Sequence, residues 1–259
     1  MKIQEFYSFF DKLFSRALRA EWDNDGLACC PDPTREVHRV LISLDASDAA
    51  VKRAVEGSFD VLLTHHPLLF RGVKALTTEQ TVPRKLIELV RAGVCAMSFH
   101  TRLDAADGGV NDILAKTLNL TDTVPFAPEG EVPCGRIGTL QEPMRAADFA
   151  AMAARALHTS ALSFSGDAEK QIRTVAVLGG EGGDFTDAAR EAGADLFLAG
   201  RIGYHRAIDA AEEGLCLIEA GHYTTELPVC AHLASLVREL DASIECEILD
   251  APGIRPLTF

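Results

Sequence analysis

The chain has 259 residues, of which 47% are hydrophobic and 24% are charged, enough for one large or two modest globular domains with a real core. Its formal net charge of −13 argues against a nucleic-acid backbone as the main partner, because no basic face is evident. No apolar run approaches the ~20 residues that a membrane-spanning helix needs. The first residues, MKIQEFYSFFDKLF, read as an amphipathic helix and not as a signal peptide, so we expect a cytoplasmic protein.

Strands and helices alternate through the first half of the sequence. The predicted elements are helix 1–20, strand 40–44, helix 47–57, strand 60–63, helix 83–92, strand 93–97 and helix 109–118. The strands are short apolar runs rich in branched residues. The helix at 47–57 has a serine-type cap before it and a glycine after it, and Pro83 suits the first turn of its helix. Strands separated by helices indicate parallel pairing and an α/β fold.

The same alternation restarts after a stretch that runs from Pro125 to Pro133. The predicted elements are helix 146–158, strand 174–178, helix 184–192, strand 195–199, helix 205–213, strand 215–220, helix 224–240 and a final strand near 244–249. We therefore expect two α/β subdomains, one of residues 1–125 with 232–259 and the other of residues 126–231, with the functional site at their interface.

The two halves resemble each other in sequence. A shift of 135 residues places Val40 on Val175 and Asp60 on Asp195. With a slightly different offset, the pattern His100-x-x-x-Asp104 matches His222-x-x-x-Glu226. A period this long does not fit a solenoid and suggests an internal duplication that gave two similar α/β subdomains.

The seven cysteines are scattered and form no C-x-x-C pair. This pattern argues against a disulfide framework and against a cysteine-rich zinc knuckle. We expect buried free thiols in a reducing compartment.

Three clusters of possible metal ligands follow predicted strands. They are Thr64-His65-His66-Pro67, His100-Thr101-Arg102-Leu103-Asp104 and His222-Tyr223-Thr224-Thr225-Glu226. Ligands of parallel α/β sheets bind at the carboxyl ends of strands, and a spacing of four residues puts two side chains on one helix face. Each cluster alone could be surface histidines or a capping carboxylate beside a bystander histidine, but three strand-end clusters are improbable by chance. Five or six such ligands fit two metals ~3.5–4 Å apart, and imidazole with carboxylate suits Zn, Mn, Fe or Ni.

Four other features of the sequence support less specific predictions. Residues 22–27, WDNDGL, predict a turn whose tryptophan packs on the body of the protein, near the mouth of a pocket. They lack the alternating oxygen ligands and the terminal glutamate of a calcium loop. The run Gly179–Gly183 predicts a flexible strand-to-helix turn, with phosphate binding as the alternative. Asp45 is interpreted as a helix cap, with a role in the pocket as the alternative. His205 could line the pocket.

The motifs of the chain resemble those of the GTP cyclohydrolase I type 2-like family, also called the NGG-interacting-factor-like family. The residues that carry the resemblance are Trp22-Asp23-Asn24-x-Gly26-Leu27, Leu63-Thr64-His65-His66-Pro67, His100-Thr101-x-Leu103-Asp104 with Gly108-Gly109-Val110-Asn111-Asp112, and Gly221-His222-Tyr223-Thr224-Thr225-Glu226. They cover nearly the whole chain in the right order. Arg102 and Arg201 depart from the family pattern, which leaves details of the substrate pocket open.

The resemblance implies a dinuclear metal centre with ligands at His65, His66, Asp104, His222 and Glu226. It implies two intertwined α/β subdomains without the insertion of longer members, and a toroidal homohexamer whose metal sites face an inner cavity. His100 would be an extra ligand or a neighbour that handles protons.

Two hypotheses for function follow. The first is a metal-dependent hydrolase, a GTP cyclohydrolase 1 type 2 homolog that acts on a nucleotide-like or phosphoester substrate, with His100 as the catalytic proton carrier. The second is a protein without catalysis, a metal carrier or a regulatory metal-binding protein. The sequence does not name the metal or the substrate.

Overall fold

A computed structural model describes residues 1–128 and 130–254. The chain divides into two compact units. Unit 1 consists of Met1–Leu103 and the described residues from Val229 onward, and unit 2 consists of Asp104–Pro228. Unit 2 is therefore inserted into the sequence of unit 1, so the chain passes between the units twice.

Unit 1 is built on a five-stranded sheet with the order β1-β4-β3-β2-β11. The strands are β1 (Gly26–Cys29), β2 (Arg39–Ser43), β3 (Val61–Thr64), β4 (Cys95–Ser98) and β11 (Glu245–Leu249). The four strands from β4 to β11 are parallel, and β1 is antiparallel to β4. The parallel pairs put the carboxyl ends of β2, β3 and β4 at one edge of the sheet.

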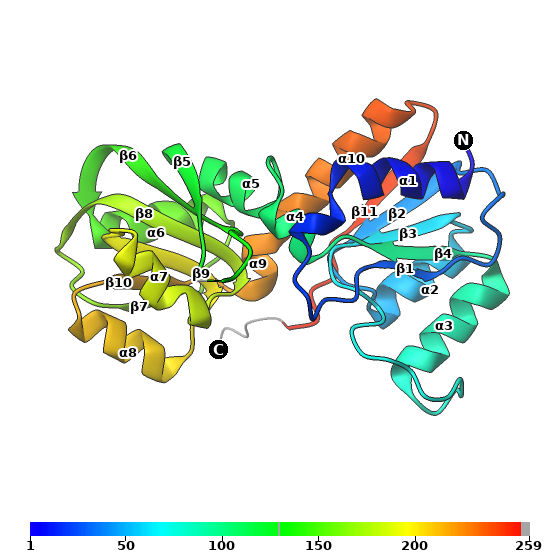
Figure 1. Cartoon of the computed structure of the whole chain (residues 1–259), viewed down its shortest axis with the longest axis horizontal. Coiled ribbons are helices and arrows are strands. Elements are labelled where there is room, and N and C mark those ends of the chain that lie inside the picture. The colour runs from blue at the N-terminus through cyan, green and yellow to red at the C-terminus, as the bar shows by residue number, and fades with distance from the viewer. Residues whose placement is uncertain (129, 255–259) are drawn as a thin grey trace. The chain divides into compact units, whose positions relative to one another are not determined.

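Helices cover both faces of this sheet (Figure 1). They are α1 (Ile3–Leu13), the short 3₁₀ helix η1 (Arg16–Leu18), α2 (Asp48–Glu56), α3 (Thr81–Ala92) and α10 (Pro228–Leu240). Helices α2 and α3 bury Val51 and Leu89 against sheet residues such as Leu41 and Leu62. Helices α1 and α10 cover the opposite face (Figure 1). Both faces of β2, β3 and β4 are thus buried, which explains why these strands consist mainly of apolar residues.

Unit 2 is built on a six-stranded sheet with the order β5-β6-β8-β9-β10-β7. The strands are β5 (Thr121–Phe126), β6 (Gly135–Arg145), β7 (Ser163–Ser165), β8 (Gln171–Glu181), β9 (Leu196–Arg201) and β10 (Cys216–Glu219). Strands β8, β9 and β10 are parallel, and the other three pair antiparallel at the two sides.

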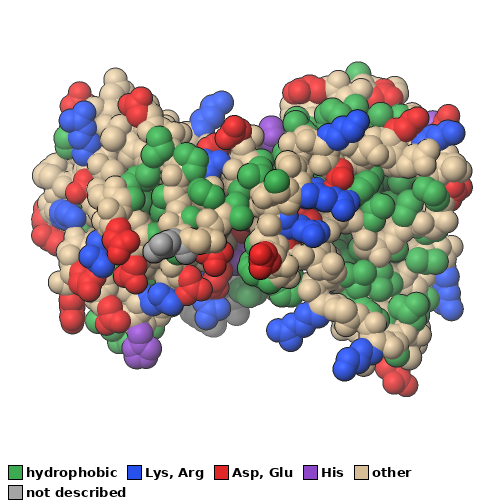
Figure 2. All heavy atoms as spheres, in the orientation of Figure 1, with side chains coloured by type: hydrophobic (Ala, Val, Ile, Leu, Met, Phe, Trp, Pro, Cys, Tyr) green, Lys and Arg blue, Asp and Glu red, His purple; other side chains and the backbone are tan. Residues whose placement is uncertain are grey.

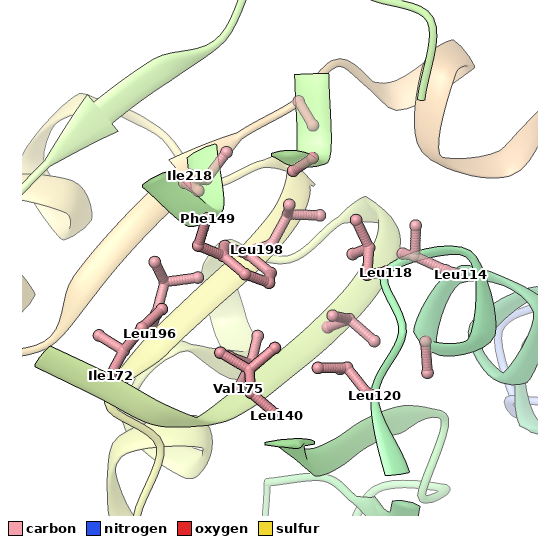
Figure 3. Packing of buried hydrophobic residues seen from close by; sticks show 14 of the residues in the cluster. Leu114, Leu118, Leu120, Leu140, Phe149, Ile172, Val175, Leu196, Leu198 and Ile218 are labelled. Atoms are coloured by element: carbon pink, nitrogen blue, oxygen red, sulfur yellow. The ribbon is translucent and has the colours of Figure 1, made fainter. Parts of the chain in front are cut away.

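Unit 2 also contains helices, most of which pack on its sheet. They are α4 (Thr101–Ala105), which spans the division between the units, α5 (Val110–Thr117), α6 (Ala146–Ala156), the 3₁₀ helix η2 (Gly183–Phe185), α7 (Thr186–Glu191), α8 (Tyr204–Glu212) and α9 (His222–Glu226). Figure 3 shows Leu114 of α5 and Phe149 of α6 in one core with Val175 and Leu198 of the sheet. Helices α7 and α8 contribute to the core on the other face.

The two sheets share a plan that fits an internal duplication. In each, three parallel strands are followed by an antiparallel edge strand, as β2-β3-β4-β1 and as β8-β9-β10-β7. Asp60 Oδ2 accepts hydrogen bonds from the backbone N–H groups of residues 38 and 39, at 2.8 and 2.9 Å. Asp195 Oδ2 accepts from residues 173 and 174, both at 2.9 Å. These contacts coincide under the 135-residue shift, so the repeat is structural and the α/β prediction is confirmed.

Several predicted elements differ in extent from the observed ones. The N-terminal helix ends at Leu13, and the helix containing Pro83 begins two residues earlier, at Thr81. The helix predicted at 224–240 is two helices, α9 and α10, separated at Leu227. The prediction missed β1, β5, β6 and β7, which lie outside the parallel strands.

No helix in the described part of the chain is both long and apolar enough to cross a membrane. On the face shown in Figure 2, acidic and basic side chains are interspersed with hydrophobic ones. The cytoplasmic location stays a prediction, as does the absence of a nucleic-acid partner.

Candidate metal centre

The first two candidate ligands in unit 1 follow strand β3. His65 and His66 come directly after Thr64, its last residue. The His65 side chain is fully buried, and its Nδ1 lies 2.9 Å from the backbone oxygen of Phe99. A carbonyl oxygen only accepts hydrogen bonds, so Nδ1 carries the proton and Nε2 is the nitrogen that can bind a metal.

Asp45 orients the second histidine. His66 Nδ1 lies 2.8 Å from Oδ1 of Asp45, which follows strand β2. The interpretation of Asp45 as a helix cap is wrong, because the N-cap of α2 is Ser47, whose hydroxyl accepts from the N–H of Ala50 at 3.1 Å. Asp45 instead fixes the plane of the His66 ring, as carboxylates commonly do behind metal-binding histidines.

Asp23 orients the third histidine of unit 1. His100 Nδ1 lies 2.9 Å from Asp23 Oδ1, and Asp23 Oδ2 accepts from Thr101 Oγ1 at 2.6 Å and from its N–H at 3.1 Å. Burial by itself would raise the pKa of Asp23, but the hydrogen bond and charge of His100 and the bonds from Thr101 lower it, to about 2. Asp23 is therefore ionised near neutral pH and accepts from the His100 Nδ1–H.

The three histidines of unit 1 converge. One ring nitrogen from each of His65, His66 and His100 lies within 4.8 Å of the others. The ring centroids are 4.9, 5.3 and 5.5 Å apart. Because each Nδ1 already has an oxygen partner, Nε2 is the nitrogen of each ring that remains available to a metal. This group of residues could hold a metal ion.

Arg102, which departs from the family pattern, lies beside these residues. Its side chain is fully buried, and its Nε donates to Asp25 Oδ2 at 2.7 Å. The same Asp25 oxygen accepts from the His100 N–H at 3.1 Å, and Arg102 Nη1 donates to Asp11 Oδ1 at 2.8 Å. The arginine thus ties α1 to the segment that carries His100, which is a structural role.

Unit 2 brings its own candidate ligands together. His222 and Glu226 lie at opposite ends of α9, with 3.1 Å between His222 Nε2 and Glu226 Oε2. A carboxylate oxygen of Asp104 lies within 4.8 Å of one of Glu226. Glu226 is only 4% exposed, whereas the side chain of His222 is 45% exposed. In this unit Glu226 therefore lies close to His222 and to Asp104.

The glycines at the end of β8 determine how closely α9 approaches the sheet. A Cβ on Gly180 would lie 2.3 Å from Glu226 Oε1 and 3.2 Å from the His222 ring, and a Cβ on Gly179 would lie 3.1 Å from Glu226 Cγ. The Gly180 N–H donates to Thr225 Oγ1 at 3.1 Å. The prediction of a flexible turn is wrong for these two residues, which belong to β8, and they make room for Glu226.

Sequence reasoning missed the residues that hold Asp104 in place. Asn111 Nδ2 donates to the backbone oxygen of Asp104 at 3.2 Å, and Asn111 Oδ1 accepts from the Gly179 N–H at 2.7 Å. The buried Arg136 donates to the backbone oxygen of Ala105 at 3.1 Å. The only sequence signal was the asparagine in the Gly-Gly-Val-Asn-Asp motif.

The remaining candidates lie elsewhere. His205 is exposed on α8, 5.4 Å from the Tyr204 ring between centroids. Among the described residues it belongs to no group that could hold a metal, and no cysteine does. The described cysteines form no disulfide. Ligation by the five residues that the resemblance implies stays a prediction.

Comparison with known proteins shows related chains over nearly the full length of the sequence. A protein of Clostridium perfringens (strain 13 / Type A) is 31% identical over 251 residues, with 95% of each chain covered. One of Streptomyces coelicolor is 34% identical over 260 residues, with 97% of this chain and 88% of the relative covered. Both are called GTP cyclohydrolase 1 type 2 homolog.

Solved structures share the fold. Reduced HcgD from Methanocaldococcus jannaschii has a TM-score of 0.84 and 28% identity, with 97% of this chain and 98% of that chain covered. A Bacillus cereus protein related to NIF3 has a TM-score of 0.87 at 23% identity, with 100% and 99% covered. The model of the Duf34/NIF3 (NGG1p interacting factor 3) family matches residues 1–252, and the chain belongs to this family.

Proposed function

We propose that the chain binds two divalent metal ions through His65, His66, Asp104, His222 and Glu226. The observation that carries this proposal is the orientation of the histidines in unit 1. Each has its Nδ1 held by an oxygen, and their ring nitrogens meet within 4.8 Å. Structural histidines do not need to converge in this way, whereas metal-binding ones do.

The two carboxylates of the proposed ligand set lie close in sequence to the points where the chain passes from one unit to the other. The chain passes from unit 1 to unit 2 between Leu103 and Asp104, and it returns between Pro228 and Val229. Asp104 is thus the first residue after one crossing, four residues beyond His100, and Glu226 comes just before the other. The carboxylate ligands lie where the covalent chain links the two units.

The chemistry of the donors fits the proposed metals. Imidazole nitrogens with carboxylate oxygens suit Zn, Mn, Fe or Ni, and two carboxylates allow bridging between two ions. No thiolate takes part in a metal-holding group of the described residues, which is unlike the usual structural zinc site.

We propose that the site hydrolyses a nucleotide-like or phosphoester substrate, in line with the names of the curated relatives. Two bound metal ions would supply Lewis acidity and a water of lowered pKa, ~7 in favourable zinc sites. We propose that His100, whose Nδ1 lies 2.9 Å from Asp23 Oδ1, moves a proton at the leaving group through Nε2 and is not itself a metal ligand. We further propose a cytoplasmic homohexamer as the working form.

The test measures metals and turnover on the same preparations. Purified protein is analysed for bound metal, stripped with a chelator, reloaded with each candidate ion, and assayed on a panel of nucleotides and phosphoesters. The proposal expects about two metals per chain and turnover that His65→Ala abolishes. His205→Ala is the matched control, because this histidine is exposed on α8 and should change neither quantity.

The outcomes separate the two parts of the proposal. Bound metal that exchanges with a chelator within minutes, without turnover on any substrate, would reject the hydrolase and favour a metal carrier. Unchanged metal content in His65→Ala would reject the metal site itself.

A further inference from the structure

Two exposed aromatic rings lie beside the histidine cluster of unit 1. Trp22 is 61% exposed and Phe70 is 49% exposed, although large aromatic side chains are mostly buried in folded proteins. The Trp22 ring lies 5.9 Å from the His100 ring and 5.9 Å from the Phe70 ring, measured between centroids. Phe70 lies 6.3 Å from His100. The exposed rings therefore adjoin a residue of the candidate metal centre.

Hydrogen bonds hold the two rings in this place. Asn24 Nδ2 donates to the backbone oxygen of Leu69 at 2.5 Å, which ties the residue before Phe70 to the turn that carries Trp22. Asp23, the neighbour of Trp22, is 6% exposed and anchors His100. Each exposed ring is thus one or two residues away from a fixed polar contact.

The arrangement of the rings suits a flat ligand. The ring planes are inclined by 61° for Trp22 and Phe70, 72° for Trp22 and His100, and 78° for Phe70 and His100. The three rings are therefore steeply inclined to one another, and much of the Trp22 surface is exposed to solvent. A planar ring can stack on an indole face and meet the edge of a second aromatic ring.

We propose that Trp22 and Phe70 form a binding subsite for the aromatic ring of a small-molecule substrate. This inference rests on the proposed function, which supplies the reaction at the neighbouring metal centre. The ligand class is a planar heteroaromatic ring, such as a purine, with polar substituents that extend toward His100. The residues next to the two rings in sequence, Glu21 and Arg71, are exposed and charged, so polar side chains flank the exposed rings. That suits a small ring better than a protein partner, whose interface core is more extended.

The test uses Trp22 as its own probe, because it is the only tryptophan in the chain. Guanosine 5′-monophosphate is titrated into the full-length protein, both metal-loaded and chelator-treated, while tryptophan emission is recorded. Ribose 5-phosphate is the matched ligand, with the same sugar and phosphate but no ring. We expect saturable quenching by the nucleotide and none by ribose 5-phosphate.

Variants identify the ring contacts. Phe70→Ala should weaken binding about 5- to 150-fold, which is the ~1–3 kcal/mol that base stacking contributes in alanine substitutions. Leu76→Ala is the control, since this residue is 68% exposed and lies in the same connection between β3 and α3. By calorimetry, Trp22→Phe should retain binding and Trp22→Ala should lose it.

Three results would overturn the subsite: no quenching, equal quenching by ribose 5-phosphate, or unchanged affinity in Phe70→Ala. Emission that shifts on dilution without ligand would also overturn it, because a second copy of the chain would then cover Trp22. Metal content is measured on the same samples. If the wild-type protein binds no metal but guanosine 5′-monophosphate still quenches Trp22, only the proposed function is rejected. If the wild-type protein binds metal but not the nucleotide ring, only the subsite is rejected.

Discussion

Substitution of Gly180 by alanine should displace the carboxylate of Glu226 with little further damage to unit 2. The new Cβ would lie 2.3 Å from Glu226 Oε1, a distance that must grow to at least about 3.0 Å. The oxygen is the far end of a flexible side chain, so it moves and the backbone of β8 stays in place. A displaced ligand no longer meets a metal at the ~2.0–2.2 Å that a carboxylate ligand requires.

The substitution has two costs that can be separated. Gly180 has φ +72°, so alanine pays roughly 1–2 kcal/mol for a left-handed conformation. Gly193 has φ +86° with no atom near its missing Cβ, so Gly193→Ala pays the same strain without the collision. Both variants should lose similar free energy of unfolding in urea. Only Gly180→Ala should lose metal affinity, by about 10- to 100-fold, as when groups that orient metal ligands are removed.

The assay is calorimetric titration of metal into chelator-treated protein, with circular dichroism to confirm the fold. Equal metal affinity in the two glycine variants would refute the reasoning. A double variant provides a second check: Gly180→Ala should add no further loss of metal affinity to Glu226→Ala, because residues that act through one contact are not additive. Additive losses would show that Gly180 acts on the site by another route.

Three further outcomes follow from the contacts. Ser47→Ala should lower the free energy of unfolding of unit 1 by about 1 kcal/mol in urea, as loss of an N-cap does. Asp45→Ala should leave the stability of α2 unchanged, because Asp45 does not cap it. Equal effects of the two variants would contradict the cap assignment. Asp195→Ala should lower the free energy of unfolding by about 1–3 kcal/mol, because it leaves two backbone N–H groups unpaired. Asp60→Ala should lower it at least as much, because Asp60 is more buried. Both losses are measured as shifts of the urea midpoint. Burial would raise the pKa of Asp11, but hydrogen bonds from two arginines and a tyrosine lower it overall. Its carboxylate therefore stabilises the fold above pH ~3.8, and that contribution is lost as the pH falls through the lowered pKa. The difference in free energy of unfolding between wild type and Asp11→Asn should therefore shrink on acidification.

The histidines of unit 1 could be predicted because their placement follows from local rules. An apolar run predicts a buried strand, and the carboxyl ends of parallel strands meet at one edge, so His65 and His100 were expected there. The structure brings them together with His66 as this argument requires. The argument needed no information about distant parts of the chain.

The residues that orient the ligands could not be found this way. Asp23 contacts His100 across 77 positions of sequence, and Asn111 contacts Gly179 across 68. No periodicity or spacing rule connects such pairs. Asp45 was misread because an acidic residue just before a helix resembles a cap, and only the fold shows that Ser47 has that role.

The missed strands have a different cause. Strand β5 is exposed at five of its six positions, so it lacks the alternation of apolar and polar residues that marks a half-buried strand. Strand β7 has only three residues, fewer than a pattern needs. Both are edge strands of the sheet. Such strands form mainly because the neighbouring strand offers backbone hydrogen bonds, and less because their own side chains favour a strand.

The insertion of unit 2 within the sequence of unit 1 sets an order for folding on the ribosome. Strand β11 pairs with β2 from more than two hundred residues away, as in the contact between Arg39 and Glu245. Unit 2 is a continuous segment and can fold as soon as it has emerged, whereas the sheet of unit 1 must keep one edge open until β11 has been made. During synthesis, that open edge of β2 is the surface on which a chaperone would be expected to act.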